Sequence, residues 1–319
     1  MSLIVQDLSY IHPNKDFLFQ NITFTIPAGE KCAIVGNNGV GKSTLLRILA
    51  GKIPPATGTI VCDDILYMIP QHFGQFDGMS VAEALGLADK LRALSIILDG
   101  RGTEKEYEQL NDEWDIPERL TEAFAKWQIG HIAPDMLMGN LSGGEKTRVF
   151  LAGQDIFKPS IVLMDEPTNH LDTTGRALVY EDIAHTNRTT VIVSHDRTLL
   201  NRLSAIYEMS PTGMQFYPMN YDAYRETVDA ETKAKVTRLE NQQKELAKAE
   251  KSARKTIERQ QKHASRGEKQ NAKKCVARIS MGLLRNKSEA TTSRLNKVQQ
   301  EKMEAMRRDI HEIRSSINE

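Results

Sequence analysis

The segment that most constrains how this chain can fold is GNNGVGKST, residues 36–44. It lies between an apolar run at 32–35 and the helix-favouring sequence STLLRILAG, and it matches the pattern G-x-x-x-x-G-K-[ST] in a strand-to-helix context. Its glycines let successive backbone N–H groups turn inward on phosphate oxygens, and the start of the helix adds a favourable partial charge. The sequence therefore predicts a phosphate-binding loop in an α/β fold. The residues expected to contact the phosphates are Gly36, Asn37, Asn38, Gly39, Val40, Gly41, Lys42, Ser43 and Thr44.

Two residues of this loop and two carboxylates further along the chain predict a metal-dependent reaction. Lys42 is placed to reach the β- and γ-phosphates of a nucleotide, and Ser43 is placed to ligate Mg²⁺. Asp165 follows the apolar run at 161–164, a position from which an Asp holds the Mg²⁺ ion. Glu166 comes next and is placed to accept a proton from an attacking water. The alternative is an exposed acidic turn, but two carboxylates after a buried strand are costly without a cation.

Two further polar residues follow apolar runs. His195 comes after the run at 191–193 and is the expected sensor of the γ-phosphate. Gln71 follows ILYMIP and is expected to contact the metal or the attacking water, although a surface glutamine is an equally good interpretation of this residue alone. Continuous apolar runs are typical of the central strands of a parallel sheet, and ligands bind outside the carboxyl ends of such strands. We therefore expect these polar residues and the phosphate loop to meet at one edge of the sheet.

Composition limits the class of protein. The 319 residues suffice for one large domain with an appendage or for two domains, and a hydrophobic content of 40% is enough for a core. No apolar stretch reaches the roughly 18 residues that a membrane-spanning helix needs, and the start of the sequence lacks the features of an export signal. The three cysteines have neither metal-like nor disulfide-like spacing. These features predict a cytoplasmic protein with no membrane partner.

The net charge of zero hides an asymmetry between two parts of the chain. Residues 1–222 contain 18 Lys+Arg and 28 Asp+Glu, a balance of −10, whereas residues 223–319 contain 24 and 14, a balance of +10. Within the second part, residues 254–287 hold 11 basic and two acidic residues and no Phe, Tyr or Trp. The split predicts a domain boundary near residue 222 and an anionic partner for the second part. The alternative for such a charged stretch is a solvated helix face.

Two stretches have helical patterns. Residues of about 74–158 are expected to form a helical subdomain, with Trp114 and Trp127 in its core. In residues 223–319 the apolar residues recur at heptad-like spacing, which predicts two long helices folded against each other, with the first ending near Ala264 and the reversal between 267 and 292. The residues expected to form the two apolar stripes are Val236, Leu239, Leu246, Ala253, Ile257, Met303, Met306, Ile310, Ile313 and Ile317.

A second phosphate-binding device occurs about a hundred residues after the first, in LSGGEKTR at 141–148. Together with Gln71, DEPTNHLD and VSHDR, these motifs resemble those of the ATP-binding cassette (ABC) superfamily over residues 1–222. The form DEPTNHLD is similar to the ABC-F branch, whose soluble members act on ribosomes, and a charged helical linker like 223–319 follows the first cassette in that branch. The resemblance implies an α/β ABC ATPase domain, with a parallel-sheet phosphate-loop core, an antiparallel β edge and a helical subdomain, followed by an α-helical hairpin arm.

The resemblance also implies roles for individual residues. ATP and Mg²⁺ would be bound at 36–44, with Ser43, Gln71 and Asp165 around the metal, and Glu166, His195 and Gln71 would act in catalysis. The signature contacts to a phosphate would come from Ser142, Gly143 and Gly144, and residues 169–172 would form the loop that crosses to a partner cassette. His12 lies where many cassettes place the aromatic residue that stacks on adenine, with Tyr10 nearby.

In this superfamily the signature of one cassette closes over the ATP held by another, so the resemblance implies a second, head-to-tail cassette as partner. That cassette is either a missing second half or another copy, because the chain holds only one; we expect a natural truncation, the product of a split gene or an expressed fragment. Hydrolysis by the isolated cassette is expected to be weak. Residues 254–287 would contact ribosomal RNA and tRNA, in general translation, in rescue of stalled complexes or in antibiotic protection. The alternatives are the energising subunit of a membrane transporter and a DNA-repair or chromosome-organising ATPase with a coiled-coil arm.

Overall fold

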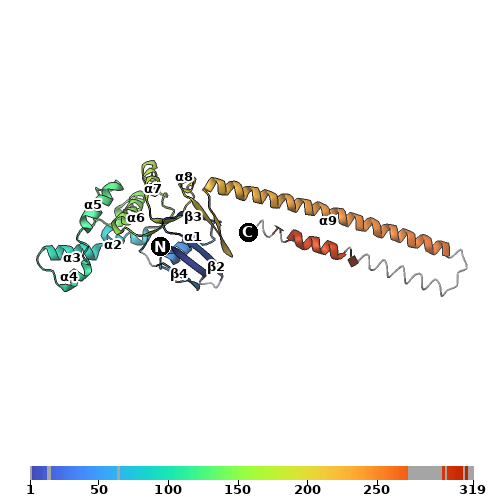
Figure 1. Cartoon of the computed structure of the whole chain (residues 1–319), viewed down its shortest axis with the longest axis horizontal. Helices are drawn as coiled ribbons and strands as arrows, with labels where there is room; N and C mark the ends of the chain where they lie inside the picture. Colours follow the sequence, from blue (N-terminus) through green and yellow to red (C-terminus); the bar gives the residue numbers. More distant parts are fainter. Residues whose placement is uncertain are drawn as a thin grey trace. The chain divides into compact units, whose positions relative to one another are not determined.

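The computed structural model describes residues 2–12, 16–62, 65–271, 297–298, 300–311 and 313–314. The chain divides into two compact units, Met1–Tyr224 and Arg225–Glu319, each of which is described by itself. Figure 1 shows the strands gathered in the first unit and the long helix α9 (Tyr221–Asn271) leading into the second. The assignment of separate functions to the parts 1–222 and 223–319 stays a prediction.

The described strands of the first unit form two sheets. The larger sheet has the order β5-β6-β7-β3-β8-β9, in which β9 alone runs antiparallel to its neighbour. The smaller sheet is antiparallel, with the order β2-β1-β4. The strands are β1 (Leu3–Ile11), β2 (Phe17–Ile26), β3 (Lys31–Val35), β4 (Thr57–Val61), β5 (Leu66–Ile69), β6 (Ile161–Asp165), β7 (Thr189–Val193), β8 (Ala205–Ser210) and β9 (Gly213–Tyr217).

The three continuous apolar runs in the sequence are neighbouring parallel strands, as predicted. Every residue of β6 and of β7 is buried, and β3 lies between β7 and β8. Strands covered on both faces are typical of the centre of a parallel sheet. The order β6-β7-β3 places the residues that follow these strands side by side at one edge of the sheet: Glu166, Ser194 and Gly36.

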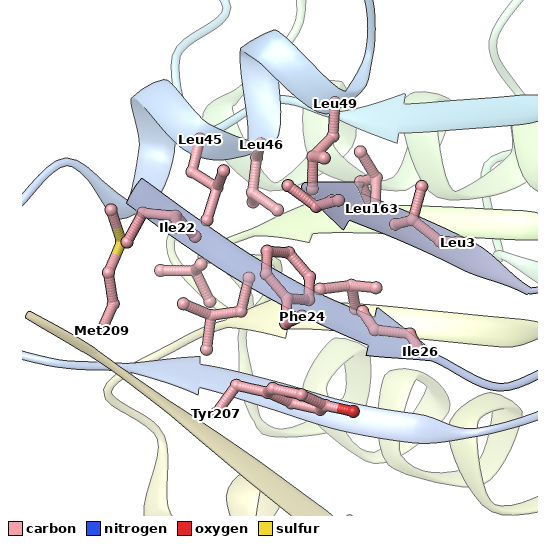
Figure 2. Packing of buried hydrophobic residues seen from close by; sticks show 14 of the residues in the cluster. Leu3, Ile22, Phe24, Ile26, Leu45, Leu46, Leu49, Leu163, Tyr207 and Met209 are labelled. Atoms are coloured by element: carbon pink, nitrogen blue, oxygen red, sulfur yellow. The ribbon is translucent and has the colours of Figure 1, made fainter. Parts of the chain in front are cut away.

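Helix α1 (Lys42–Leu49) anchors the phosphate loop to the core between the sheets. Its Leu45 and Leu46 are fully buried and face Ile22 and Phe24 of β2 (Figure 2). Burying a leucine side chain completely contributes about 1.5–3 kcal/mol relative to leaving it exposed. The first turn of α1, which carries Lys42 and Ser43, is therefore held in place by packing that does not involve a ligand.

The segment between β5 and β6 is helical, as the sequence predicts, although the bounds 74–158 stay a prediction. Trp127 is 1% exposed and its indole Nε1 donates a hydrogen bond to Asp155 Oδ2 at 2.8 Å, so the core prediction is right for this residue. The same prediction is wrong for Trp114, which is 45% exposed and lies edge-on to Tyr107. The helices are η1 (Gly74–Phe76), α2 (Val81–Leu85), α3 (Ala88–Leu98), α4 (Glu104–Leu110), α5 (Ile116–Lys126), η2 (Met138–Asn140) and α6 (Gly143–Phe157), followed later by α7 (Thr173–His185) and α8 (Arg197–Leu200).

In the second unit the chain returns alongside α9. Arg307, in the helical stretch 300–311, donates to Glu250 Oε1 at 2.8 Å. Helix α9 continues to Asn271, beyond the predicted end at Ala264. The remainder of the reversal predicted between 267 and 292, and Ile317, lie outside the described residues. Of the helices in the described ranges, none combines the length and the apolar character that crossing a bilayer requires.

The sheltered face of α9 differs from the predicted stripe. Its less exposed positions recur every three and then four residues, which is the spacing of a helix–helix seam. Val236 and Ile257, which were predicted to belong to the stripe, are 38% and 41% exposed. The sheltered positions on α9 are Leu239, Gln242, Leu246, Ala249, Ala253 and Thr256, and those on the returning segment are Met303, Met306, Ile310 and Ile313.

Candidate functional site

The loop 36–41 has a backbone that only glycine tolerates at two positions. Gly36 and Gly41 have φ values of 149° and 105°. A Cβ atom at Gly36 would lie 2.4 Å from the carbonyl oxygen of Met209, and one at Gly41 would lie 2.8 Å from a methyl carbon of Leu18. The tight approach to β8 and β2 explains the glycines of the motif and fixes a loop whose amides precede the first turn of α1.

Lys42 curls back over this loop. Its Nζ donates to the carbonyl oxygens of Gly36 at 2.8 Å and of Asn37 at 3.0 Å. Burial lowers the pKa of the Lys42 ammonium group, and the nearby Glu166 and Asp165 carboxylates partly offset that shift. The ammonium group is thus fixed at the mouth of the loop, where a bound phosphate would gain a charge-assisted hydrogen bond.

Ser43 and Asp165 form a pair with the donor chemistry of a Mg²⁺ site. Ser43 Oγ donates to Asp165 Oδ1 at 3.0 Å, across 122 residues of sequence. Asp165 is 1% exposed, and its other oxygen, Oδ2, is buried without a hydrogen-bond partner among the described residues. Burial raises the pKa of this carboxyl group, and the hydrogen bond from Ser43 opposes the shift. A buried, unpartnered carboxylate oxygen beside a hydroxyl fits a hard divalent cation, which prefers oxygen ligands.

Glu166 follows Asp165 in a left-handed backbone conformation, with φ 50°. Its own N–H donates to the Val193 carbonyl oxygen at 2.8 Å, which turns the side chain toward the end of β7. There the Oε2 atom accepts from the Ser194 hydroxyl at 3.4 Å and from the His195 N–H at 3.3 Å. Glu166 is 7% exposed, and burial raises its pKa. A strained backbone at a buried carboxylate is a feature that recurs at functional sites.

The imidazole of His195 reaches toward the same carboxylate. Its Nε2 lies 3.6 Å from Glu166 Oε1, while the side chain as a whole is 70% exposed. The structure therefore brings together the residues predicted to act on the terminal phosphate and the water. These residues are Lys42, Ser43, Asp165, Glu166 and His195.

Gln71 and His12 lie at the margins of this cluster. Gln71 is half-buried, two residues beyond the end of β5, the neighbour of β6 in the sheet. The adjacent His72 is close enough to favour the charged form of Asp165 and so to lower its pKa, which brings this turn near the metal pair. His12 is exposed just after β1, with its ring edge-on to Tyr10 at 5.9 Å. Contact of Gln71 with the metal and stacking of His12 on adenine stay predictions.

The second predicted phosphate-binding motif, LSGGEKTR, forms a separate corner at the start of α6. Ser142 precedes the helix and its hydroxyl accepts from the N–H of Glu145 at 3.3 Å. The Glu145 carboxylate in turn accepts from the Ser142 N–H at 2.8 Å and from its hydroxyl at 2.7 Å. This reciprocal arrangement is a capping box, which the sequence S-x-x-E encodes. His131 Nε2 lies 2.9 Å from the second oxygen of Glu145, a contact that no sequence motif predicts.

The loop 169–172 packs against this corner. A Cβ atom at Gly143 would lie 3.2 Å from the Cβ of His170, and one at Gly144 would lie 3.0 Å from the His170 carbonyl oxygen. Arg148 of α6 donates to Asp172 at 2.7 Å. The two motifs expected to face a partner cassette are therefore joined to each other in one chain. Within the described ranges, the hydrogen bonds and close contacts of Ser142, Gly143 and Gly144 involve this corner and not the loop 36–44.

A glycine-rich loop before a helix, a buried serine–aspartate pair and an adjacent buried glutamate are the features expected of a nucleoside-triphosphate-binding domain of the ATPase class. The family model described as "ABC transporter" matches residues 19–169. The energy-coupling factor transporter ATP-binding protein EcfA1 of Geobacillus kaustophilus (strain HTA426) is 31% identical over 216 residues, which cover 61% of this chain and 70% of that protein. The chain belongs to the ABC transporter family, as an ATP-binding cassette of the ATPase class.

Other relatives are longer proteins. The tylosin resistance ATP-binding protein TlrC of Streptomyces fradiae is 29% identical over 253 residues, which cover 72% of this chain and 46% of that protein. The ABC transporter F family member 4 of Arabidopsis thaliana is 31% identical over 242 residues, which cover 72% of this chain and 31% of that protein. The chain thus spans less than half the length of these two relatives.

Solved structures share the fold. An ATP-binding subunit of an ABC transporter superimposes with a TM-score of 0.55 at 20% identity, covering 72% of this chain and 94% of that one. A nucleotide-free cassette from an ABC transporter gives 0.54 at 16% identity, covering 72% and 96%. The prediction of an α/β ABC cassette with a helical subdomain and a helical C-terminal extension is confirmed.

Proposed function

We propose that this chain is one half of an ATP-driven clamp of the ABC-F type, which hydrolyses Mg-ATP with a second cassette and acts on the ribosome through the arm 223–319. The observation that carries the proposal is the separation of two phosphate-binding corners. One corner contains Lys42, Ser43, Asp165 and Glu166, and the other contains Ser142 with the neighbouring loop 169–172. A cassette built in this way supplies the cradle for one nucleotide, which is the loop 36–44 with Asp165 and Glu166, and the signature for another, which is Ser142, Gly143 and Gly144.

In the proposed reaction the cradle binds the triphosphate and the buried Glu166 accepts the proton of the attacking water. Lys42 would exchange its two carbonyl partners for β- and γ-phosphate oxygens. Ser43 and Asp165 would hold Mg²⁺, which would neutralise negative charge on the phosphates. Glu166 would accept the proton of the attacking water, and its raised pKa brings its basicity closer to what a general base needs at neutral pH. His195, 3.6 Å from Glu166, would bind a γ-phosphate oxygen and orient that carboxylate.

The second cassette in this proposal is another copy of the chain or a separate half, in head-to-tail orientation. Ser142 and the first amides of α6 would meet the γ-phosphate held by the partner's loop. Closure around two nucleotides is a domain-closure switch, and hydrolysis reverses it. For this reason we expect tight nucleotide binding but weak hydrolysis by a single copy.

The ribosomal part of the proposal rests on the relatives and on the charge of the arm. TlrC is named for tylosin resistance, and the plant relative is named as a member of the F family. Residues 254–287 carry 11 basic and two acidic residues without aromatic side chains, which suits recognition of structured RNA through its phosphates. General translation, rescue and antibiotic protection are all compatible with this charge pattern. EcfA1 is named as part of a transporter, so a transporter subunit is the second candidate, although that function gives no use for a basic arm.

Co-sedimentation with ribosomes tests the proposal. The Glu166→Gln variant retains the cradle and slows hydrolysis, so it should accumulate in the ATP-bound state. We expect this variant to pellet with ribosomes in Mg-ATP, together with the second cassette if that is a separate chain. The same variant without nucleotide and the Lys42→Ala variant should remain in the supernatant. If the trapped form stays in the supernatant over a range of salt concentrations, the ribosomal function is wrong; recovery in a membrane fraction would support the transporter.

A further inference from the structure

The hydroxyl of Ser142 already has an acceptor in the structure. Its Oγ lies 2.7 Å from Glu145 Oε2 and donates to it, since an ionised carboxylate is acceptor-only. A serine hydroxyl has one proton, so while it is given to Glu145 it cannot be given to a phosphate oxygen. The same Glu145 oxygen also accepts from the Ser142 N–H at 2.8 Å. The signature corner is therefore folded into a state in which its two polar donors at Ser142 point at a carboxylate of its own helix.

Glu145 is ionised at neutral pH. The hydrogen bonds from Ser142, and then the contact with His131, lower the pKa of Glu145 to about 2. The charge sits at the helix N-terminus, the place where an incoming γ-phosphate would also bring negative charge. Two anions competing for the same donors oppose each other, and the opposition grows as closure excludes water.

His131 is the partner that moderates this charge. Its Nε2 lies 2.9 Å from Glu145 Oε1, the oxygen that does not contact Ser142. An N–H donated to Oε1 draws negative charge toward that end of the carboxylate and fixes the carboxylate plane. His131 itself is 64% exposed, so its removal leaves no cavity in the core.

We propose that Glu145 restrains the Ser142 hydroxyl in the open cassette, and that His131 is a positioning residue that acts through Glu145 to ease the release of that hydroxyl to the partner's γ-phosphate. The inference deepens the proposed function and rests on the head-to-tail pairing described there. A glutamine at position 145 would keep the capping box, because the motif accepts Glu or Gln. Its neutral amide would remove the competing charge.

The test measures ATP-driven pairing of the chain with four substitutions. In the Glu166→Gln background with Mg-ATP, sedimentation velocity over a concentration series gives the pairing constant. The net contribution of one ordinary hydrogen bond changes such a constant about twofold to tenfold. Glu145→Gln should strengthen pairing by that factor and His131→Ala should weaken it. His131→Gln can still donate to Oε1, so it should recover most of the pairing that His131→Ala loses. Ser142→Ala should weaken pairing by an effect that does not depend on His131.

The decisive comparison is His131→Ala in the Glu145→Gln background, where we expect no further change because His131 acts through the carboxylate. A fluorescent ATP analogue should bind the cradle of every unpaired variant with unchanged affinity, since none of the substitutions touches residues 36–44. The inference would be overturned if Glu145→Gln paired no more strongly than the chain with Glu145, or if His131→Ala had an effect of the same size in both backgrounds. Either result would leave the proposed head-to-tail pairing of the cassettes standing. If the Glu166→Gln chain does not pair at any concentration, alone or with an added second cassette, the head-to-tail function itself fails and the inference fails with it.

Discussion

Replacing Asp165 by Asn should stabilise the nucleotide-free cassette and abolish its response to Mg²⁺. Asp165 is 1% exposed and its Oδ2 is buried without a hydrogen-bond partner among the described residues. Asn keeps an oxygen to accept from Ser43 and replaces the buried charge with a neutral amide, which is less costly to desolvate. The difference between an unpartnered charged and an unpartnered neutral group is about 1 kcal/mol in the free energy of unfolding. For a unit of this size that corresponds to a rise in melting temperature of about 2–4 °C.

The assay is thermal unfolding with and without Mg-ATP. Ligand at 100 times its Kd stabilises the wild type by about 2.7 kcal/mol, and Asp165→Asn should lose the Mg²⁺-dependent part of that gain. The matched control is Asp99→Asn, the same change at an exposed ion pair with Arg101, which should alter the free energy of unfolding by less than about 1 kcal/mol in either state. A nucleotide-free Asp165→Asn variant that melts below the wild type, or one that keeps the full Mg²⁺ response, would refute the reasoning.

Three further predictions concern the pH response, the core and the arm. Burial raises the pKa of Asp165 and of Glu166 in the folded cassette above the ordinary values that apply to the unfolded chain. The free energy of unfolding of the nucleotide-free cassette should therefore be highest below the ordinary pKa values and fall as pH rises through the raised ones. In urea titrations, Asp165→Asn combined with Glu166→Gln should flatten this dependence on pH. Trp127→Phe removes the indole donor to Asp155 and should lower the free energy of unfolding by about 1–3 kcal/mol in chemical denaturation. The same change at the exposed Trp114 should lower it by less than about 1 kcal/mol, and equal losses would contradict the assigned packing. Ala253→Glu puts a charge on the sheltered face of α9 and should increase the rate of amide hydrogen exchange in residues 300–311. Lys251→Glu, at an exposed position of the same helix, should leave that rate unchanged. Equal exchange rates in the two variants would show that the two helical stretches do not depend on this seam.

The elements that the sequence predicts best are those in which one local pattern decides the structure. The apolar runs at 32–35, 161–164 and 191–193 are buried strands because no solvated face competes for their side chains. The polar residues after them meet at one edge because parallel strands end together. The phosphate loop is likewise predictable, since its glycines and its Lys-Ser pair allow few other structures.

Prediction of burial from the sequence fails where tertiary contacts decide which of several similar side chains is buried. Val236 and Ile257 are apolar but exposed, whereas the sheltered face of α9 includes Gln242 and Thr256, because the seam is fixed by where the returning segment lies and not by apolarity. The exposure of Trp114 also depends on packing that periodicity does not encode. His131 reaches Glu145 across 14 residues, a contact that only the folded chain creates.

The central claim is that one nucleotide is shared between two cassettes, and complementation between two inactive variants tests it most directly. Ser142→Ala keeps the cradle and loses the signature hydroxyl, whereas Lys42→Ala keeps the signature and loses the cradle. Each variant alone should hydrolyse ATP slowly at every concentration. Mixing the two should restore hydrolysis, with a rate that rises with total concentration, because a mixed head-to-tail pair contains one intact site. A wild-type rate per chain that is fast and independent of concentration, with no gain on mixing, would contradict the account.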